Sequence, residues 1–232
     1  MKMVDTASAD GIRLRVRSWR GRDDVAECLA APIGALVPPD LVRAACDRAR
    51  AQGYRTMVTP ALPPFEWRPY LDAGFERREH LHLLAHDLLD LPGKGPHRLR
   101  KVRRRDRPTV LEIDHGAFQP FWRMDEATLD EAERATPSSR FRLHRGGDGY
   151  ALFGRAGNRG YVQRLAVRPG AEGRGLGTTL VVDGLWWLRR WRIAEVLVNT
   201  QESNERAVAL YEHLGFRRRA GGLAVLEADL RP

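Results

Sequence analysis

The chain has 232 residues, enough for one large or two small domains, and its 43% hydrophobic and 30% charged residues are typical of a globular protein. Its net charge of +9 comes almost wholly from arginine, and because a GC-rich coding sequence produces the same skew, the charge alone does not indicate nucleic-acid binding. The first residues lack the apolar segment of a signal peptide, and no apolar run is as long as a membrane helix. Two cysteines, Cys28 and Cys46, are too few for a disulfide framework. We therefore expect a cytoplasmic protein with reduced cysteines.

In chain order, the N-terminal half is predicted to contain a helix at 40–51, a strand at 54–59, a short helix that ends at Tyr70-Leu71 and a strand at 80–87. Turn formers and a dense basic run then mark residues 90–108 as a junction. We place a boundary near Gly95, which gives domains at 1–94 and 95–232.

The C-terminal half is predicted to begin with a basic strand at 98–104, a helix at 107–118 and a loop with a helix at 119–135. The elements expected after these are strands at 141–144, 150–156 and 160–167, a long helix at 178–191, a strand at 194–200, a helix at 204–214 and a final strand at 222–230. Strands followed by alternating helix and strand indicate an α/β fold with a mixed central sheet and flanking helices, preceded by a smaller α/β half-domain.

The two halves match each other at a constant offset of 141 residues: Thr59 with Thr200, Tyr70 with Tyr211, and Gly74-Phe75 with Gly215-Phe216. Because the order of elements agrees as well, we interpret the N-terminal half as a degenerate copy of the other. Where the C-terminal half has a glycine-rich turn, this copy has Val37-Pro38-Pro39, so we expect it to lack a cofactor loop.

The glycine-rich turn, Gly173-Arg174-Gly175-Leu176-Gly177, lies between a predicted strand end and a long helix. Alternating glycines let backbone N–H groups converge, and the positive end of the helix dipole adds to them, so the pattern indicates a phosphate cradle. A P-loop would need a lysine after the last glycine, but Thr178 follows. A dinucleotide fingerprint would need a different glycine spacing near the start of a βαβ unit, so both alternatives fit poorly.

The C-terminal half resembles the GNAT superfamily of N-acetyltransferases over about residues 97–230. Its acetyl-coenzyme A motif, Gln/Arg-x-x-Gly-x-Gly/Ala after a Leu-x-Val-x-Pro strand end, matches Leu165-Ala166-Val167-Arg168-Pro169 followed by Glu172 to Gly177. A second motif, Asn-x-x-Ala-x-x-x-Tyr-x-x-x-Gly-Phe, matches residues 204–216, from Asn204 and Ala207 to Tyr211 and Phe216.

The resemblance implies a role for each matched residue. The backbone of Leu165, Ala166 and Val167 would bind the pantetheine arm of acetyl-coenzyme A and polarise the thioester carbonyl. Amides from Glu172, Gly173, Arg174, Gly175, Leu176, Gly177 and Thr178 would hold the pyrophosphate, while Asn204 and Ala207 would line the cofactor arm. Tyr211 would act as the general acid that protonates the leaving thiolate. Asn204 also suits a helix N-cap, and we expect it to serve both purposes. No metal is expected.

Two features depart from the family pattern. Glu172 stands where the family has Gln or Arg, and we expect its carboxylate to face solvent or pair with Arg168 or Arg174, weakening cofactor binding. No general base is evident: alternation places Tyr161, Gln163 and Leu165 on one face, where the first two could only order a water. Asp114 and His115 are alternatives, although a solvated helix face explains them equally well.

The acceptor is expected to be a primary amine of a small molecule or a peptide N-terminus. It would be contacted by four apolar residues beside the acidic run 125–133, namely Phe118, Phe121, Trp122 and Met124. A packed aromatic cluster and a solvated acidic helix explain the same residues. A non-catalytic acyl-coenzyme A binding module is the alternative function. Nucleic-acid binding through the basic run at 97–107 is disfavoured, because no aromatic residue is interleaved for base stacking.

Overall fold

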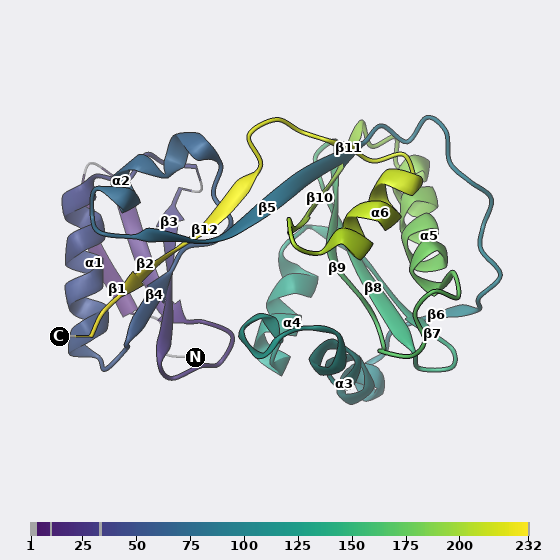
Figure 1. Ribbon diagram of the computed structural model, residues 1–232, viewed down its shortest axis with the longest axis horizontal. Coiled ribbons are helices and arrows are strands. Elements are labelled where there is room, and N and C mark those ends of the chain that lie inside the picture. Colours follow the sequence, from purple (N-terminus) through teal and green to yellow (C-terminus); the bar gives the residue numbers. More distant parts are fainter. Residues whose placement is uncertain (1–3, 10, 33, 232) are drawn as a thin grey trace. The chain divides into compact units, whose positions relative to one another are not determined.

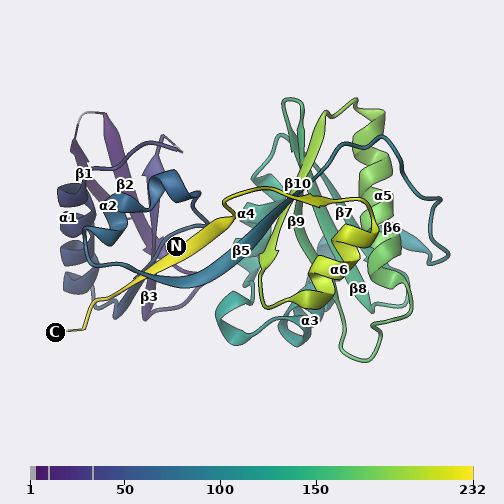
Figure 2. The same cartoon turned by 45° about the horizontal axis from the view of Figure 1, so that its top comes forward.

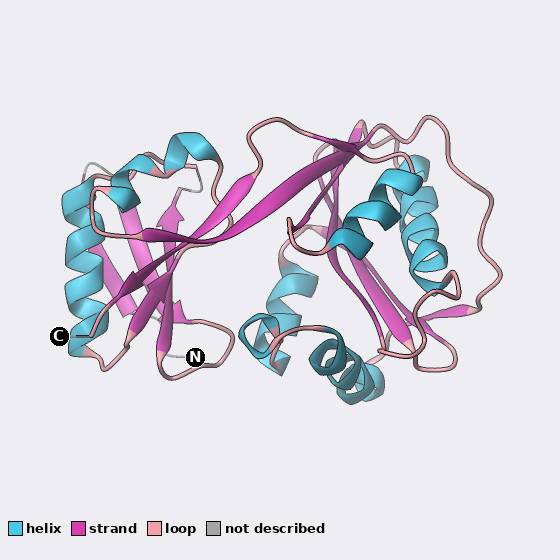
Figure 3. Ribbon diagram, in the orientation of Figure 1, coloured by secondary structure: helices cyan, strands magenta, loops and turns pink. Residues whose placement is uncertain are grey.

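The computed structural model describes residues 4–9, 11–32 and 34–231. By its internal contacts the chain divides into an N-terminal unit, Met1–His82 with Ala220–Pro232, and a C-terminal unit, Leu83–Arg219. Both combine helices with a sheet (Figures 1 and 3), and the predicted α/β fold class is confirmed.

The N-terminal unit has a sheet in the order β1-β2-β3-β4-β12-β5, covered by helices α1 and α2. Its core contains Leu14, Met57 and Leu226, all fully buried. The elements of this unit are β1 (Val4–Ala9), β2 (Ile12–Ser18), β3 (Val25–Ala31), α1 (Pro39–Ala51), β4 (Thr56–Val58), the 3-10 turn η1 (Pro64–Glu66), α2 (Arg68–Leu71), β5 (Glu76–His86) and β12 (Leu223–Asp229).

The C-terminal unit has a sheet in the order β5-β10-β9-β8-β7-β6, to which β5 contributes its last residues, and β11 pairs with β5 there. Helices α5 and α6 pack on one face of this sheet, and α3 and α4 pack on the other (Figure 2). The elements are β6 (Leu99–Lys101), η2 (Arg104–Asp106), α3 (Arg107–Ala117), η3 (Pro120–Trp122), α4 (Glu126–Arg134), β7 (Ser138–His144), β8 (Gly149–Ala156), β9 (Arg159–Val167), α5 (Leu176–Arg190), β10 (Glu195–Gln201), α6 (Glu205–His213) and β11 (Arg217–Arg218).

Local chemistry fixes several of these helix ends. The Asp125 carboxylate accepts a hydrogen bond from the Thr128 N–H at 2.7 Å and begins α4. Pro108 stands in the first turn of α3, where a missing N–H is harmless. The predicted helices at 107–118, 178–191 and 204–214 are confirmed to within about two residues.

The two units share one order of elements. In the N-terminal unit β2 and β3 are antiparallel, and β3 is parallel to β4 across α1. In the C-terminal unit β8 and β9 are antiparallel, and β9 is parallel to β10 across α5. The strands β1 to β3 are not among the elements that the sequence patterns predict, so the N-terminal unit shares more of this order of elements than expected.

The turn before α1 differs from that before α5 in its hydrogen-bonding capacity. Pro38 is the N-cap of α1 and Pro39 is its first residue. Because proline has no backbone N–H, the start of α1 lacks two of the donors that a phosphate would need.

The contact-based division differs from the boundary that we place near Gly95. Residues 83–94 belong to the C-terminal unit, and β12, which we expect to complete the C-terminal half, belongs to the N-terminal unit. There β12 pairs with β4 and with β5, both antiparallel. Strand pairing between segments this far apart in the chain has no signature in local sequence patterns.

Candidate functional site

The glycine-rich turn presents a row of unused backbone donors at the start of α5. Gly173 and Gly175 have φ values of +74° and +77°, which only glycine adopts easily, and Gly175 is the N-cap of α5. In the described part of the chain, the N–H groups from Gly173 to Gly177 donate to no backbone carbonyl. Free N–H groups at the positive end of a 15-residue helix fit a phosphate or pyrophosphate.

The strand that leads into this turn has an open edge. β8 pairs with β9 along its length, including Leu165, Ala166 and Val167. On the other side, β10 pairs with β9 only at Arg159, Gly160 and Tyr161. Over the described residues, the peptide groups of Leu165 to Val167 therefore have a strand partner on one side only, and their other edge can accept an extended polar ligand.

A β-bulge separates these two parts of β9. Leu152 of β8 is opposite Arg164, whereas Phe153 is opposite Val162, so Gln163 is an extra residue. The Gln163 Nε2 donates to the Ala132 carbonyl of α4 at 2.9 Å, and Arg164 reaches α3. Leu165 packs with the residues of α5 instead.

The predicted alternation on β9 is therefore wrong. Gln163 and Leu165 do not share a face, because the extra residue at the bulge shifts the two-residue period. The Gln163 Nε2 is engaged by the Ala132 carbonyl, but its Oε1 is buried and has no hydrogen-bond partner among the described residues, so that Gln163 orders a water stays a prediction.

Helix α6 lies on the same face of the sheet as α5 and begins at Asn204. The Asn204 side-chain oxygen accepts from the Ala207 N–H at 3.1 Å, which confirms the predicted N-cap. Further along α6, Leu210 lies close to the end of the glycine turn: a Cβ added at Gly177 would be 3.2 Å from the Leu210 Cδ2. Contacts of Asn204 and Ala207 with a cofactor stay a prediction.

Tyr211 is buried on α6, with 4% of its surface exposed, and its ring lies 5.3 Å from that of Phe216. Burial raises the pKa of the Tyr211 hydroxyl, so it keeps its proton at neutral pH. This hydroxyl has no hydrogen-bond partner among the described residues. That this hydroxyl protonates the leaving thiolate stays a prediction.

Glu172 forms an ion pair that the sequence analysis does not anticipate. Its carboxylate lies 2.5 Å from the Arg206 guanidinium of α6. Arg168 is engaged elsewhere, at 2.9 Å from Glu112 and 3.0 Å from the Gly147 carbonyl. The predicted partners, Arg168 and Arg174, are thus wrong, because the first turn of α6 brings a cation nearer, whereas the exposure of Glu172 agrees with the expectation that it faces solvent.

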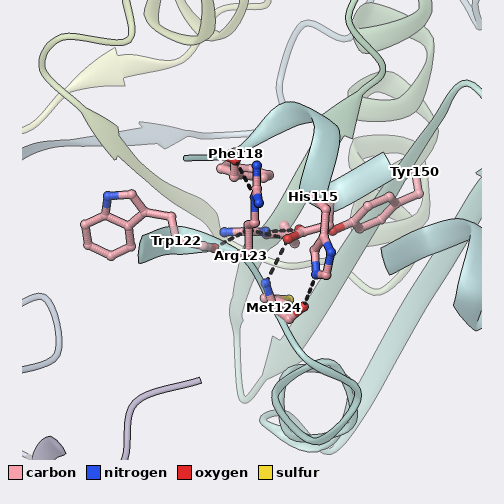
Figure 4. A network of polar contacts seen from close by, with 8 residues as sticks. His115, Phe118, Trp122, Arg123, Met124 and Tyr150 are labelled. Carbon is pink, nitrogen blue, oxygen red and sulfur yellow. Dashed lines mark hydrogen bonds and ion pairs between the residues drawn. The ribbon is translucent and has the colours of Figure 1, made fainter. Parts of the chain in front are cut away.

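A buried network beside the bulge contains the acidic residue considered as a general base. Asp114 on α3 is fully buried and accepts from the Tyr150 hydroxyl at 2.6 Å, Arg164 Nε at 2.8 Å and the Met124 N–H at 2.9 Å (Figure 4). The Arg164 guanidinium also stacks 3.4 Å from the centre of the Phe118 ring and donates to the Trp122 carbonyl.

This network excludes Asp114 as a base. Burial alone would raise the pKa of Asp114, but the hydrogen bond and charge of Arg164, with the Tyr150 hydroxyl and the Met124 N–H, more than offset it and hold that pKa below its usual range. The other alternative, His115, is exposed and its Nε2 donates to the Met124 carbonyl at 2.8 Å. No sequence motif predicts the network, because Asp114, Tyr150 and Arg164 lie on three different elements.

The residues considered for acceptor binding differ in their surroundings. Met124 is buried in the cluster under α3 and α4, and Phe118 lies against Arg164. The indole of Trp122 extends away from the network (Figure 4). In α4, Asp130 and Glu133 both pair with Arg107. Two of the five acidic residues of the run 125–133 are thus paired with an arginine within the unit.

The basic run at 97–107 is partly occupied by contacts within the unit. Arg100 lies 2.5 Å from the Asp106 carboxylate, and His97 bonds to the glycine turn. In the described residues no helix is long and apolar enough to cross a membrane, and no group of three metal-ligating side chains occurs. Cys28 and Cys46 are free and buried.

Comparisons with known proteins agree with this geometry. Residues 110–216 match the model of the acetyltransferase (GNAT) family. A mycothiol acetyltransferase of Rhodococcus jostii is 32% identical over an alignment of 132 residues that covers 49% of this chain and 43% of the relative. One from Acidothermus cellulolyticus is 39% identical over 115 residues, or 47% and 35% of the two chains. The chain thus matches less than half the length of these relatives.

Solved structures show the same fold over nearly the whole chain. A tandem GNAT protein from the clavulanic acid biosynthesis pathway has a TM-score of 0.69 at 18% identity, covering 97% of this chain and 82% of the other. A GCN5-related N-acetyltransferase from Kribbella flavida has a TM-score of 0.64 at 15% identity, covering 100% and 90%. By the family match, the fold and the two sequence motifs, residues 110–216 belong to the acetyltransferase (GNAT) family.

Proposed function

We propose that the protein is an N-acetyltransferase that moves an acetyl group from acetyl-coenzyme A to a primary amine. The observation that carries this proposal is the pairing of unused N–H groups at Gly173 to Gly177 with the open edge at Leu165 to Val167. The first suits a pyrophosphate and the second an extended pantetheine arm. Acetyl-coenzyme A would supply the activated thioester.

The chain's own residues would then act in a single complex with both substrates. A backbone N–H beside the bulge would stabilise the charge that develops on the carbonyl oxygen as the amine attacks. Tyr211 would donate its proton to the leaving sulfur. The names of the curated relatives favour a small-molecule amine over a peptide N-terminus. The buried, free Cys28 and Cys46 support a cytoplasmic location.

The proposal is tested by thiol release from acetyl-coenzyme A across a panel of small amines and peptides with free N-termini. We expect amine-dependent release by the natural chain and, with Tyr211→Phe, release at least about 100-fold slower. Binding of acetyl-coenzyme A without release for any amine would contradict catalysis and support the alternative, a non-catalytic acyl-coenzyme A binding module.

A further inference from the structure

His97 connects the segment before β6 to the glycine turn. Its Nε2 lies 2.8 Å from the carbonyl oxygen of Arg174. Because a carbonyl only accepts hydrogen bonds, Nε2 must carry the proton and donate it. This contact lies outside the sequence motifs of the family, which begin at residue 165.

The contact fixes the direction of one peptide group. A trans peptide is planar, with its C=O and N–H pointing in opposite directions. When His97 holds the Arg174 carbonyl, the N–H of Gly175 must point away from His97. The next carbonyl, of Gly175, accepts from the Thr179 N–H at 3.0 Å and its hydroxyl at 3.1 Å. Two successive carbonyls are thus held, and with them the directions of the N–H groups of Gly175 and Leu176.

The segment that carries His97 is itself held against α5. Trp186 Nε1 donates to the Pro92 carbonyl at 2.9 Å. Gly95 approaches so closely that an added Cβ would lie 2.1 Å from the Thr179 hydroxyl. The His97 ring also packs edge-on against His144, with ring centres 5.5 Å apart. His97 is therefore placed by its surroundings.

We propose that His97 is a positioning residue for the pyrophosphate cradle, acting through the Arg174 peptide and not by touching the ligand. The flexible Gly173–Gly177 turn would otherwise sample other peptide orientations, so a ligand would have to order it on binding. This inference rests on the proposed function, because it assumes that the turn binds the pyrophosphate of a coenzyme A thioester.

Two substitutions separate the hydrogen bond from the ring packing. His97→Phe keeps an aromatic ring against His144 but has no donor, whereas His97→Gln keeps an N–H donor at a similar reach. We expect His97→Phe to weaken acetyl-coenzyme A binding about fivefold in calorimetric titration, equivalent to about 1 kcal/mol. His97→Gln should stay within about twofold of the natural chain. His213→Ala, at an exposed histidine of α6, is the matched control and should bind normally.

A second ligand distinguishes a specific effect on the pyrophosphate cradle from a general loss of ligand binding. S-acetylpantetheine lacks the pyrophosphate, so its binding, followed by ligand-observed NMR, should be equal in the natural chain and His97→Phe. Equal loss of both ligands, or no loss of acetyl-coenzyme A affinity in His97→Phe, would overturn the role of His97 while the proposed function stands. Failure of the natural chain to bind acetyl-coenzyme A would overturn the proposed function, and the role of His97 with it.

Discussion

Removing the Asp114 carboxylate is expected to destabilise the C-terminal unit strongly. Asp114 is fully buried, and the Arg164 side chain that it neutralises is only 9% exposed. Asp114→Ala leaves that guanidinium without its counter-ion and the Tyr150 hydroxyl without its acceptor. Breaking a buried ion pair from one side costs about 3–5 kcal/mol, so the free energy of unfolding should fall by that amount.

Urea unfolding followed by tryptophan fluorescence at pH 7 measures this loss. A double variant, Asp114→Ala with Arg164→Met, removes both charges and should be more stable than Asp114→Ala alone, because no buried charge is left unpaired. A loss under about 1 kcal/mol for Asp114→Ala, or a double variant less stable than the single one, would refute this reasoning.

The same network predicts how stability depends on pH. The pKa of Asp114 lies below its usual range, so its contribution is complete above the unfolded-state pKa of about 4 and is lost as the pH falls through the folded-state pKa. Between pH 7 and pH 3 the natural chain should therefore lose more stability than Asp114→Asn, which has no carboxylate to protonate at this position. Parallel pH profiles of the two chains would contradict it.

Two further predictions concern the site. Tyr211→Phe should lower turnover at least about 100-fold while the affinity for acetyl-coenzyme A, measured by calorimetry, stays nearly unchanged, because only the hydroxyl is removed; unchanged turnover would exclude Tyr211 from the mechanism. Glu172→Gln should raise the affinity for acetyl-coenzyme A by up to about fivefold. The substitution removes a negative charge beside the cradle and frees Arg206 from an exposed ion pair. An unchanged dissociation constant would show that Arg206 plays no part in binding.

Local patterns predict much of the C-terminal unit. Helix periodicity, the N-cap at Asn204 and the glycines before α5 are short-range features, and the elements that they predict lie where expected. The contacts that depend on distant segments are those that the patterns miss. The Glu172–Arg206 pair joins a loop to a helix, and the placement of β12 in the N-terminal unit depends on pairing with β4 and β5.

The bulge at Gln163 explains the principal error at the site. Strict alternation is the simplest expectation for a strand, but one extra residue reverses the faces of everything after it. The bulge brings Arg164 to the α3 side, where it meets Asp114. Without a glycine or proline at 163, the sequence gives no signal for it.

The most direct test of the account is calorimetric titration of the chain with acetyl-coenzyme A. Micromolar binding, about −8 kcal/mol, is expected, and Gly175→Ala should weaken it strongly because alanine is strained at a φ of +77°. Gly157→Ala is the matched control, with a φ of +57° in the turn between β8 and β9 and, as at Gly175, no atom within 4 Å of an added Cβ. Micromolar binding by the natural chain, weakened in Gly175→Ala but not in Gly157→Ala, is the predicted result; no binding by the natural chain, or equal binding by both variants, would contradict the account.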